Sequence, residues 1–211
     1  MLEIELKSKD LKEYICLDLK KDKSEPIYDE DLNKITELDL DRYDLVDDLT
    51  DVTLEDIVFF NNLKRCYLSN FVFDDKNVSL LSRQKNLEFL QINDCAFKNS
   101  KELSLGVKHL VIVDSENVNL SKYNDLNSLE KLHIVNCVNT NINGISKFKN
   151  LSKVYLQNLC LEDLNEMKSM NNLTYINLNG SKIKDSSFEK SNTDFIIEHE
   201  ELNAIYESEE N

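Results

Sequence analysis

Apolar residues recur through most of the chain in the pattern L-x-x-L-x-L. One copy begins at Leu151, continues through Val154 and Leu156, and is followed by the next copy at Leu173. Equivalent copies start at residues 35, 63, 87, 107, 129, 151 and 173, and the last three intervals are each 22 residues long. A constant interval of this length is typical of a protein built from repeated structural units.

Each unit contains two kinds of apolar spacing. The alternation at Val154 and Leu156 predicts a short strand with one buried face. Leu161, Leu164 and Met167 lie three residues apart, which predicts a helical or 3₁₀ turn. A single unit cannot bury its own apolar face, so neighbouring units must stack to cover it. The pattern therefore predicts a curved solenoid whose parallel strands, about 4.8 Å apart, form the concave side.

This pattern resembles the leucine-rich repeat family over residues 35–198. The likeness is closest to the short class, with a repeat near 22 residues, as in bacterial internalins and one protein phosphatase regulatory subunit. The resemblance implies an α/β fold, namely a right-handed solenoid of seven or eight repeats with a parallel concave sheet. A weaker eighth unit is expected to place Phe195 and Ile197 at its two inward strand positions.

The ninth position of the family's repeat usually holds Asn, whose amide bonds the neighbouring backbone turn. Here the position holds Tyr43, Phe71, Cys95, Ser115, Cys137, Leu159 and Ser181. The thiol and hydroxyl side chains can form part of such a ladder, whereas Phe71 and Leu159 cannot. We expect apolar packing to replace the hydrogen bonds at those two turns.

The two ends of the chain differ from the repeats. Residues 2–19 alternate twice between apolar and polar side chains, which predicts a β-hairpin that caps the solenoid. The long first repeat contains a predicted helix with Thr53 as its N-cap. We expect one structural domain that consists of an N-terminal cap (1–34), the repeats (35–198) and a C-terminal tail (199–211).

The net charge of −15 is unevenly distributed. Residues 1–60 carry −11, residues 61–184 carry +4 and residues 185–211 carry −8. Polar ends are expected of a solenoid because they keep its terminal units soluble. In the alternative interpretation, an acidic end attracts a basic partner. No continuous basic stripe is present, so we expect no nucleic-acid binding.

The cysteines and the lengths of the apolar runs indicate in which cellular compartment the protein is expected. The five cysteines form no C-x-x-C pair, and Cys95 and Cys137 lie two repeats apart, about 10 Å at sheet spacing and beyond disulfide reach. Buried free thiols indicate a reducing compartment. The chain shows no signal-peptide pattern and no apolar run near the ~20 residues that span a bilayer. We expect a cytoplasmic monomer or weak dimer without membrane contact.

Motifs for catalysis are absent from the sequence. It contains no Gly-rich phosphate loop, no G-x-S-x-G and no H-E-x-x-H. His109 and His133 are expected on outward strand positions of adjacent repeats, but a zinc site needs further ligands, and none lies at a clear spacing. We therefore predict a protein that is not an enzyme, with no catalytic residue, no cofactor and no metal.

The outward-facing strand positions remain as the candidate for function. Several hold aromatic or β-branched residues, which are good strand formers, but a contiguous exposed apolar patch is more typical of a binding site. The predicted partner-binding residues are Tyr67, Phe89, His109, Val111, Val113, Lys131, His133, Val135, Lys153, Tyr155 and Tyr175.

The leading hypothesis is a non-catalytic interaction module that binds a protein partner through the concave sheet. One alternative is an acidic inhibitor or immunity protein that neutralises a basic toxin or nuclease, because both ends are acidic and Glu37, Asp39 and Asp41 form an acidic edge. The other alternative, implied by the family resemblance, is a regulatory subunit of an enzyme.

Overall fold

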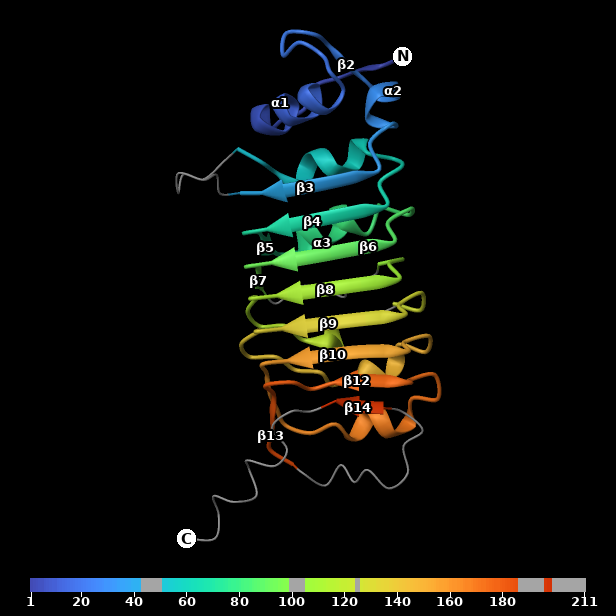
Figure 1. Cartoon of the computed structure of the whole chain (residues 1–211). Helices are drawn as coiled ribbons and strands as arrows, with labels where there is room; N and C mark the ends of the chain where they lie inside the picture. The colour runs from blue at the N-terminus through green and yellow to red at the C-terminus, as the bar shows by residue number, and fades with distance from the viewer. Residues whose placement is uncertain (43–50, 99–104, 124–125, 186–195, 199–211) are drawn as a thin grey trace.

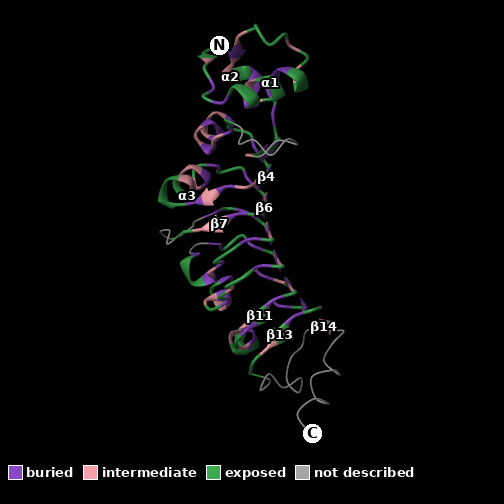
Figure 2. Cartoon of the chain, turned by 90° about the vertical axis from the view of Figure 1, so that its left-hand side faces the viewer, coloured by how far each residue is buried: buried purple, intermediate pink, exposed green. Residues whose placement is uncertain are grey.

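A parallel sheet of eight strands runs along the length of the molecule (Figure 1). The computed structural model describes residues 1–42, 51–98, 105–123, 126–185 and 196–198. Among these residues, short helices on the opposite side follow five of the strands, and Figure 2 shows this two-sided arrangement from the edge. In spatial order the strands are β3 (Glu37–Asp41), β4 (Arg65–Ser69), β6 (Phe89–Asn93), β8 (His109–Val113), β9 (Lys131–Val135), β10 (Lys153–Gln157), β12 (Tyr175–Asn177) and β14 (Ile196–Glu198).

The register between strands is constant and follows the repeat. Leu110 lies opposite Leu132, which lies opposite Val154, and Ile112 lies opposite Ile134 in the same way. These inward side chains are fully buried, so each unit covers the apolar face of the next, as the repeat predicts. The leucine-rich repeat solenoid is confirmed.

The side opposite the sheet is built from short helical turns. Thr53 caps the first of them, where its hydroxyl accepts a hydrogen bond from the Glu55 N–H, so the predicted helix start is confirmed, although the helix is of the 3₁₀ type. Asp74, Asn119 and Asp163 accept equivalent bonds in later repeats. The helices are η1 (Leu54–Phe59), α3 (Asp75–Leu81), η2 (Leu120–Lys122), η3 (Ile145–Lys147) and η4 (Asn165–Ser169).

Two further short parallel pairs lie beside the helical turns. They join segments from neighbouring repeats and continue the stacking outside the main sheet. The pairs are β5 (Val72–Phe73) with β7 (Ala96–Phe97), and β11 (Cys160–Leu161) with β13 (Lys182–Ile183).

The ninth position of the repeat forms the partial ladder expected from the sequence. The Ser115 hydroxyl accepts a hydrogen bond from the Cys95 N–H at 3.1 Å, and the Ser181 hydroxyl accepts one from the Leu159 N–H at 2.9 Å. Phe71 and Leu159 are buried, so apolar packing does replace a polar side chain there. Tyr43 lies outside the described residues.

A second ladder of asparagines was not predicted. Four asparagines stand directly before the first apolar residue of a repeat, and each donates its side-chain N–H to a backbone carbonyl of the preceding repeat or, for the first, of the cap: Asn62, Asn86, Asn150 and Asn172. The bonds are 2.6–2.8 Å long. They satisfy carbonyls where the chain enters each strand.

The N-terminal cap differs from the predicted hairpin. β1 (Glu3–Ile4) does pair antiparallel with β2 (Ile27–Tyr28), but α1 (Lys9–Asp18) occupies most of the predicted second strand, and α2 (Asp29–Leu32) follows. Ser8 caps α1 by accepting from the Leu11 N–H. Leu11 and Ile15, four residues apart, are both buried. This helical spacing and the N-cap decide the structure over the apolar alternation of residues 15–19.

Two carboxylates, one buried and one exposed, join the cap to the first repeat. Asp56 is fully buried, and its two oxygens accept from the backbone N–H groups of Lys7 and Ser8, each at 2.9 Å. Asp51 accepts from the Ser8 hydroxyl and the Lys9 N–H. These charge-assisted bonds fix the start of α1 against η1.

The eighth strand is present, but its register differs from the prediction. Ile197 lies opposite Ile176 and packs against the core, whereas the predicted alignment placed it beside Leu178. The alignment is therefore wrong by two residues. Phe195 and the predicted tail 199–211 lie outside the described residues.

Candidate protein-binding surface

The eleven predicted partner-binding residues lie on the outward face of six consecutive strands, β4, β6, β8, β9, β10 and β12. We call the outward positions of β3 through β12 the concave face. The strand register brings residues of neighbouring repeats together, with Lys131 beside Lys153, and His133 beside Tyr155. Lys131 and Lys153 are exposed, and the other nine residues are half-buried.

Six of these side chains form a continuous row of rings across the sheet. We call them the ring row: Tyr67, Phe89, His109, His133, Tyr155 and Tyr175. Successive ring centroids lie 5.3, 5.0, 4.9, 4.0 and 5.2 Å apart. These separations are those of direct aromatic contacts, so each ring restrains the next.

Arg65 ends the row at its N-terminal side and is not among the predicted partner-binding residues. Its guanidinium lies 4.3 Å from the Phe89 ring centroid, donates a hydrogen bond of 2.7 Å to the Tyr67 hydroxyl, and lies 3.5 Å from the Glu37 carboxylate. The strand register places it opposite Phe89, whereas its hydrogen bond to Tyr67 depends on side-chain conformation. A stacked cation of this kind holds the first two rings in place.

The two imidazoles in the row are neutral at pH 7. Burial, then His109 and then Lys131, lowers the pKa of His133 to about 4. Burial also lowers the pKa of His109, as do Lys131 and Arg65, and the His109 Nε2 atom is buried without a partner among the described residues. Both rings therefore act as aromatic surface. Within the described ranges, no three His, Cys, Asp or Glu side chains gather as a metal site.

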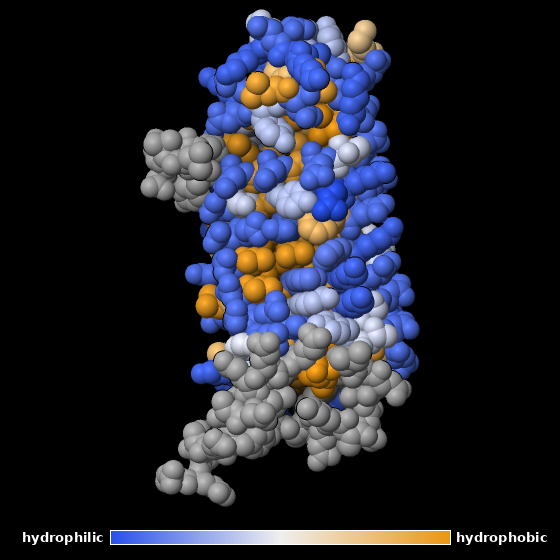
Figure 3. Space-filling view, viewed as in Figure 1, coloured by the Kyte–Doolittle hydropathy of each residue, from blue (hydrophilic) through white to orange (hydrophobic). Residues whose placement is uncertain are grey.

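Valines extend the apolar surface beside the ring row. Val113 lies opposite Val135, and Val111 lies opposite His133. Figure 3 shows the resulting hydrophobic area over β8 and β9, with polar surface around it. The patch is thus continuous from the rings to the carboxyl ends of the strands.

The two ends of the concave face are polar. On β3, Glu37, Asp39 and Asp41 point outward, and burial followed by the charges of Asp41 and Glu37 raises the pKa of Asp39. On β12, Asn177 is only 6% exposed; its amide accepts a hydrogen bond from Gln157 and donates one to the Tyr175 hydroxyl. Asn177 thus stands opposite the outward residue Tyr155 but is itself covered.

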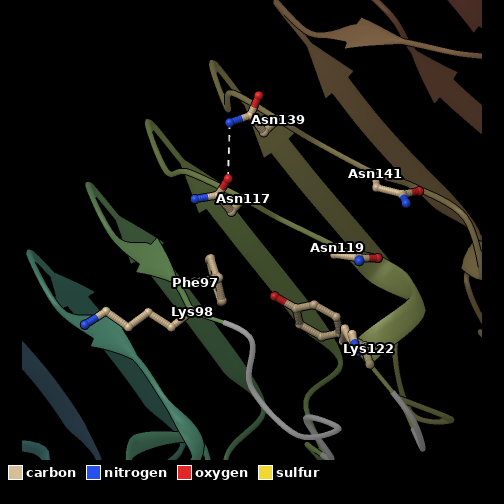
Figure 4. A pocket seen from close by; sticks show the side chains of 8 residues that line it. Phe97, Lys98, Asn117, Asn119, Lys122, Asn139 and Asn141 are labelled. Atoms are coloured by element: carbon tan, nitrogen blue, oxygen red, sulfur yellow. Dashed lines mark hydrogen bonds between the residues drawn. The ribbon is translucent and has the colours of Figure 1, made fainter.

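A pocket of about 220 Å³ lies away from the concave face, beside β7 (Figure 4). Its asparagines already serve the fold, because Asn139 donates to Asn117 at 3.1 Å and Asn119 caps η2. The lining residues are Phe97, Lys98, Asn117, Asn119, Lys122, Tyr123, Asn139 and Asn141.

Comparison with known proteins supports the fold and leaves the partner open. No protein-family model matches the chain, and no curated protein matches it. An internalin (inlF) of Listeria monocytogenes aligns with 84% of this chain at 19% identity and a TM-score of 0.57. Internalin C2 (inlC2) of the same species aligns with 91% at 16% identity and a TM-score of 0.59. InlP, also from this species, aligns with 82% at 15% identity and a TM-score of 0.61.

The extent of these alignments differs. The chain spans 93% of the inlC2 structure, but only 58% of inlF and 51% of InlP. At these identities the likeness shows a shared leucine-rich repeat fold. No helix among the described residues is long and apolar enough to cross a membrane. The cytoplasmic location stays a prediction.

Proposed function

We propose that this leucine-rich repeat solenoid is a non-catalytic module that binds a protein partner through its concave face. The observation that carries the proposal is the ring row, with the valines beside it. Stacked repeats create extended concave surfaces of the kind that repeat proteins use for binding. Aromatic side chains dominate the energetics of such interfaces.

The packing of the ring row supports a binding role. Each ring is partly buried by its neighbours and so has little rotamer freedom left to lose when a partner docks. Lys131 and Lys153 stand exposed beside the rings, where they can pair with acidic groups at the rim of an interface. Hot spots are typically aromatic groups surrounded by polar residues of this kind.

The test is partner capture from the native lysate by the wild type and by a double variant, Val113→Asp with Tyr155→Asp. Two buried charges at the interface are costly to desolvate, so we expect capture to fall at least tenfold, equivalent to about 1.4 kcal/mol or more. Both side chains lie on the outward face, and Tyr155→Asp also removes the ring stack with His133, so we expect stability to fall by about 0.5–1.5 kcal/mol or somewhat more, with a cooperative melting transition retained.

A matched control lies outside the concave face. Val138 is 54% exposed, so Val138→Asp introduces the same charge on an open surface. We expect this variant to capture the partner like the wild type. Equal capture by the concave double variant and the wild type would remove the concave face as the binding surface.

An acidic inhibitor is the second candidate, and the β3 carboxylates favour it. Three outward acids on one strand, within a segment of net charge −11, attract a basic protein. Its association should slow steeply between 50 and 500 mM salt, by about tenfold or more. A rate that is independent of salt would contradict this candidate. No described residue selects the regulatory-subunit alternative.

A further inference from the structure

Acidic and basic side chains occupy different strands of the concave face. On the described strands from β3 to β12, the outward carboxylates all lie on β3, and the outward lysines lie on β9 and β10. The other outward cation, Arg65 on β4, lies close to Glu37 and is held by Tyr67 and Phe89. The ring row and the valines fill most of the space between them. A partner that covers the whole face therefore contacts acidic side chains first, then rings and valines, and then lysines.

The sheet spacing sets the distance between these zones. Four strand intervals separate β3 from β9, which is about 19 Å at 4.8 Å per interval. That length corresponds to about six residues of extended chain or about thirteen residues of helix. One continuous protein segment is long enough to reach from the acidic strand to the lysines.

The surroundings of Asp39 favour a cation from the partner. Asp39 lies between Glu37 and Asp41 on the same exposed face, and no hydrogen bond or ion pair joins its carboxylate to another residue of the described structure. Glu37 lies close to Arg65, and Asp41 accepts from Asn70. An incoming ammonium or guanidinium group would offset the repulsion among the three acids.

Helix α1 adds apolar surface next to these acids. Tyr14 is 46% exposed and Leu17 is 71% exposed, and the phenol of Tyr14 lies within electrostatic reach of Asp39 and Glu37. Figure 3 shows hydrophobic surface at this end on the same face as the sheet. Lys and Arg side chains bury their aliphatic stems on apolar surface while the charged end meets an acid.

We propose that the concave face binds a protein segment in one orientation, with Lys or Arg side chains of the partner over β3 and its apolar side chains across the ring row. This inference rests on the proposed function and adds the chemistry of the partner. The acidic end steers the encounter, and the rings supply most of the affinity.

A displayed library of random 15-residue peptides serves as the probe. Peptides are selected on the full-length chain and screened against the Val113→Asp, Tyr155→Asp variant, so that only binders dependent on the concave face are kept. We expect the kept peptides to combine Lys or Arg with aromatic residues. Their affinity should fall at least tenfold for Asp39→Lys, and about two- to fivefold for Asp39→Asn.

Charge exchange makes the test specific. Replacing the essential basic residue of a selected peptide by Glu should weaken its binding to the wild type and restore binding to Asp39→Lys. Glu116→Gln is the control for Asp39→Asn, since Glu116 is exposed, lies outside the concave face and loses the same charge. This control should change affinity less than twofold.

The outcomes separate the two proposals. Peptides that depend on Val113 and Tyr155, but bind Asp39→Lys as well as the wild type, would overturn the orientation and leave the binding face intact. Recovery of peptides that all bind the concave double variant equally would overturn the proposed function itself. Melting curves of each variant show that a loss of binding is not a loss of fold.

Discussion

The rings of His133 and Tyr155 stack across adjacent strands, with their centroids 4.0 Å apart and their planes 16° apart. This is the shortest contact in the ring row, and it joins β9 to β10 on the concave face. Stacking of this kind contributes about 0.5–1.5 kcal/mol beyond the burial of area. Burial disfavours a charged imidazole at His133, and the neighbouring His109 and Lys131 disfavour it further.

Stability should therefore fall as the pH is lowered through the titration range of His133. Its folded pKa of about 4 is below the model-peptide value of 6.5, so the unfolded chain binds the proton first. The contribution of neutral His133 to the free energy of unfolding is fully present above pH 6.5 and is lost progressively as the pH falls toward 4. At pH 5 we expect a loss of about 1 kcal/mol, which allows for solvent screening at a half-buried ring.

Urea unfolding at pH 7 and pH 5 measures this loss. His133→Phe keeps a ring in the row and removes the titrating group, so the variant should lose less stability than the wild type over this range. Equal losses in the two proteins would show that His133 does not titrate as the packing requires.

Asp56 should be one of the most sensitive polar positions in the chain. Asp56→Ala leaves the Lys7 and Ser8 N–H groups without their acceptor at a buried site. We expect a loss of about 2–4 kcal/mol in the free energy of unfolding. Glu55→Gln, which alters exposed ion pairs with Lys7 and Lys76, should have little effect. A small loss for Asp56→Ala in urea unfolding would contradict the role of Asp56 in fixing the cap.

Gly180 should resist replacement, whereas Gly106 should not. Gly180 has φ +72°, and a Cβ there would lie 1.9 Å from the Asn158 Oδ1 atom, which belongs to a side chain held by Asn136. We expect Gly180→Ala to cost about 1–2 kcal/mol. Gly106→Ala meets its nearest atom at 4.0 Å, so it should change stability by less than about 0.5 kcal/mol. Thermal melting of the two variants gives the comparison, and equal losses would contradict it.

Thiol accessibility provides a test of the packing. Cys160 is exposed, whereas Cys16, Cys66, Cys95 and Cys137 are buried. Burial also raises the pKa of the Cys95 thiol to about 11, which disfavours the reactive thiolate. A thiol reagent should therefore modify Cys160 alone in the native protein and all five cysteines after unfolding. Rapid native modification of Cys66 or Cys137 would contradict the buried stack.

The repeat pattern was sufficient to predict the solenoid and its outward columns. The reason is that inward positions such as Leu110 and Ile112 recur with a fixed interval, and parallel stacking then places every intervening residue. This register alone predicts that the rings of His133 and Tyr155 lie side by side. It does not predict their stacking angle, because the angle depends on side-chain rotamers.

Features that depend on single contacts were not predictable from the pattern. The N-terminal helix was missed because the alternation around Ile15 imitates a strand, while Ser8 and Leu11 specify a helix start. Arg65 was passed over because its role needs the three-dimensional arrangement of Tyr67 and Phe89. The register of Ile197 was misplaced because the last repeat departs from the L-x-L spacing.

Site-specific photo-cross-linking most directly tests whether the concave face is the binding surface. A photoreactive phenylalanine analogue replaces Tyr155 on the concave face or, as the control, Val138 outside it. We predict a covalent adduct with the partner from position 155 and none from position 138. An adduct from position 138, with none from position 155, would place the partner elsewhere and contradict the account.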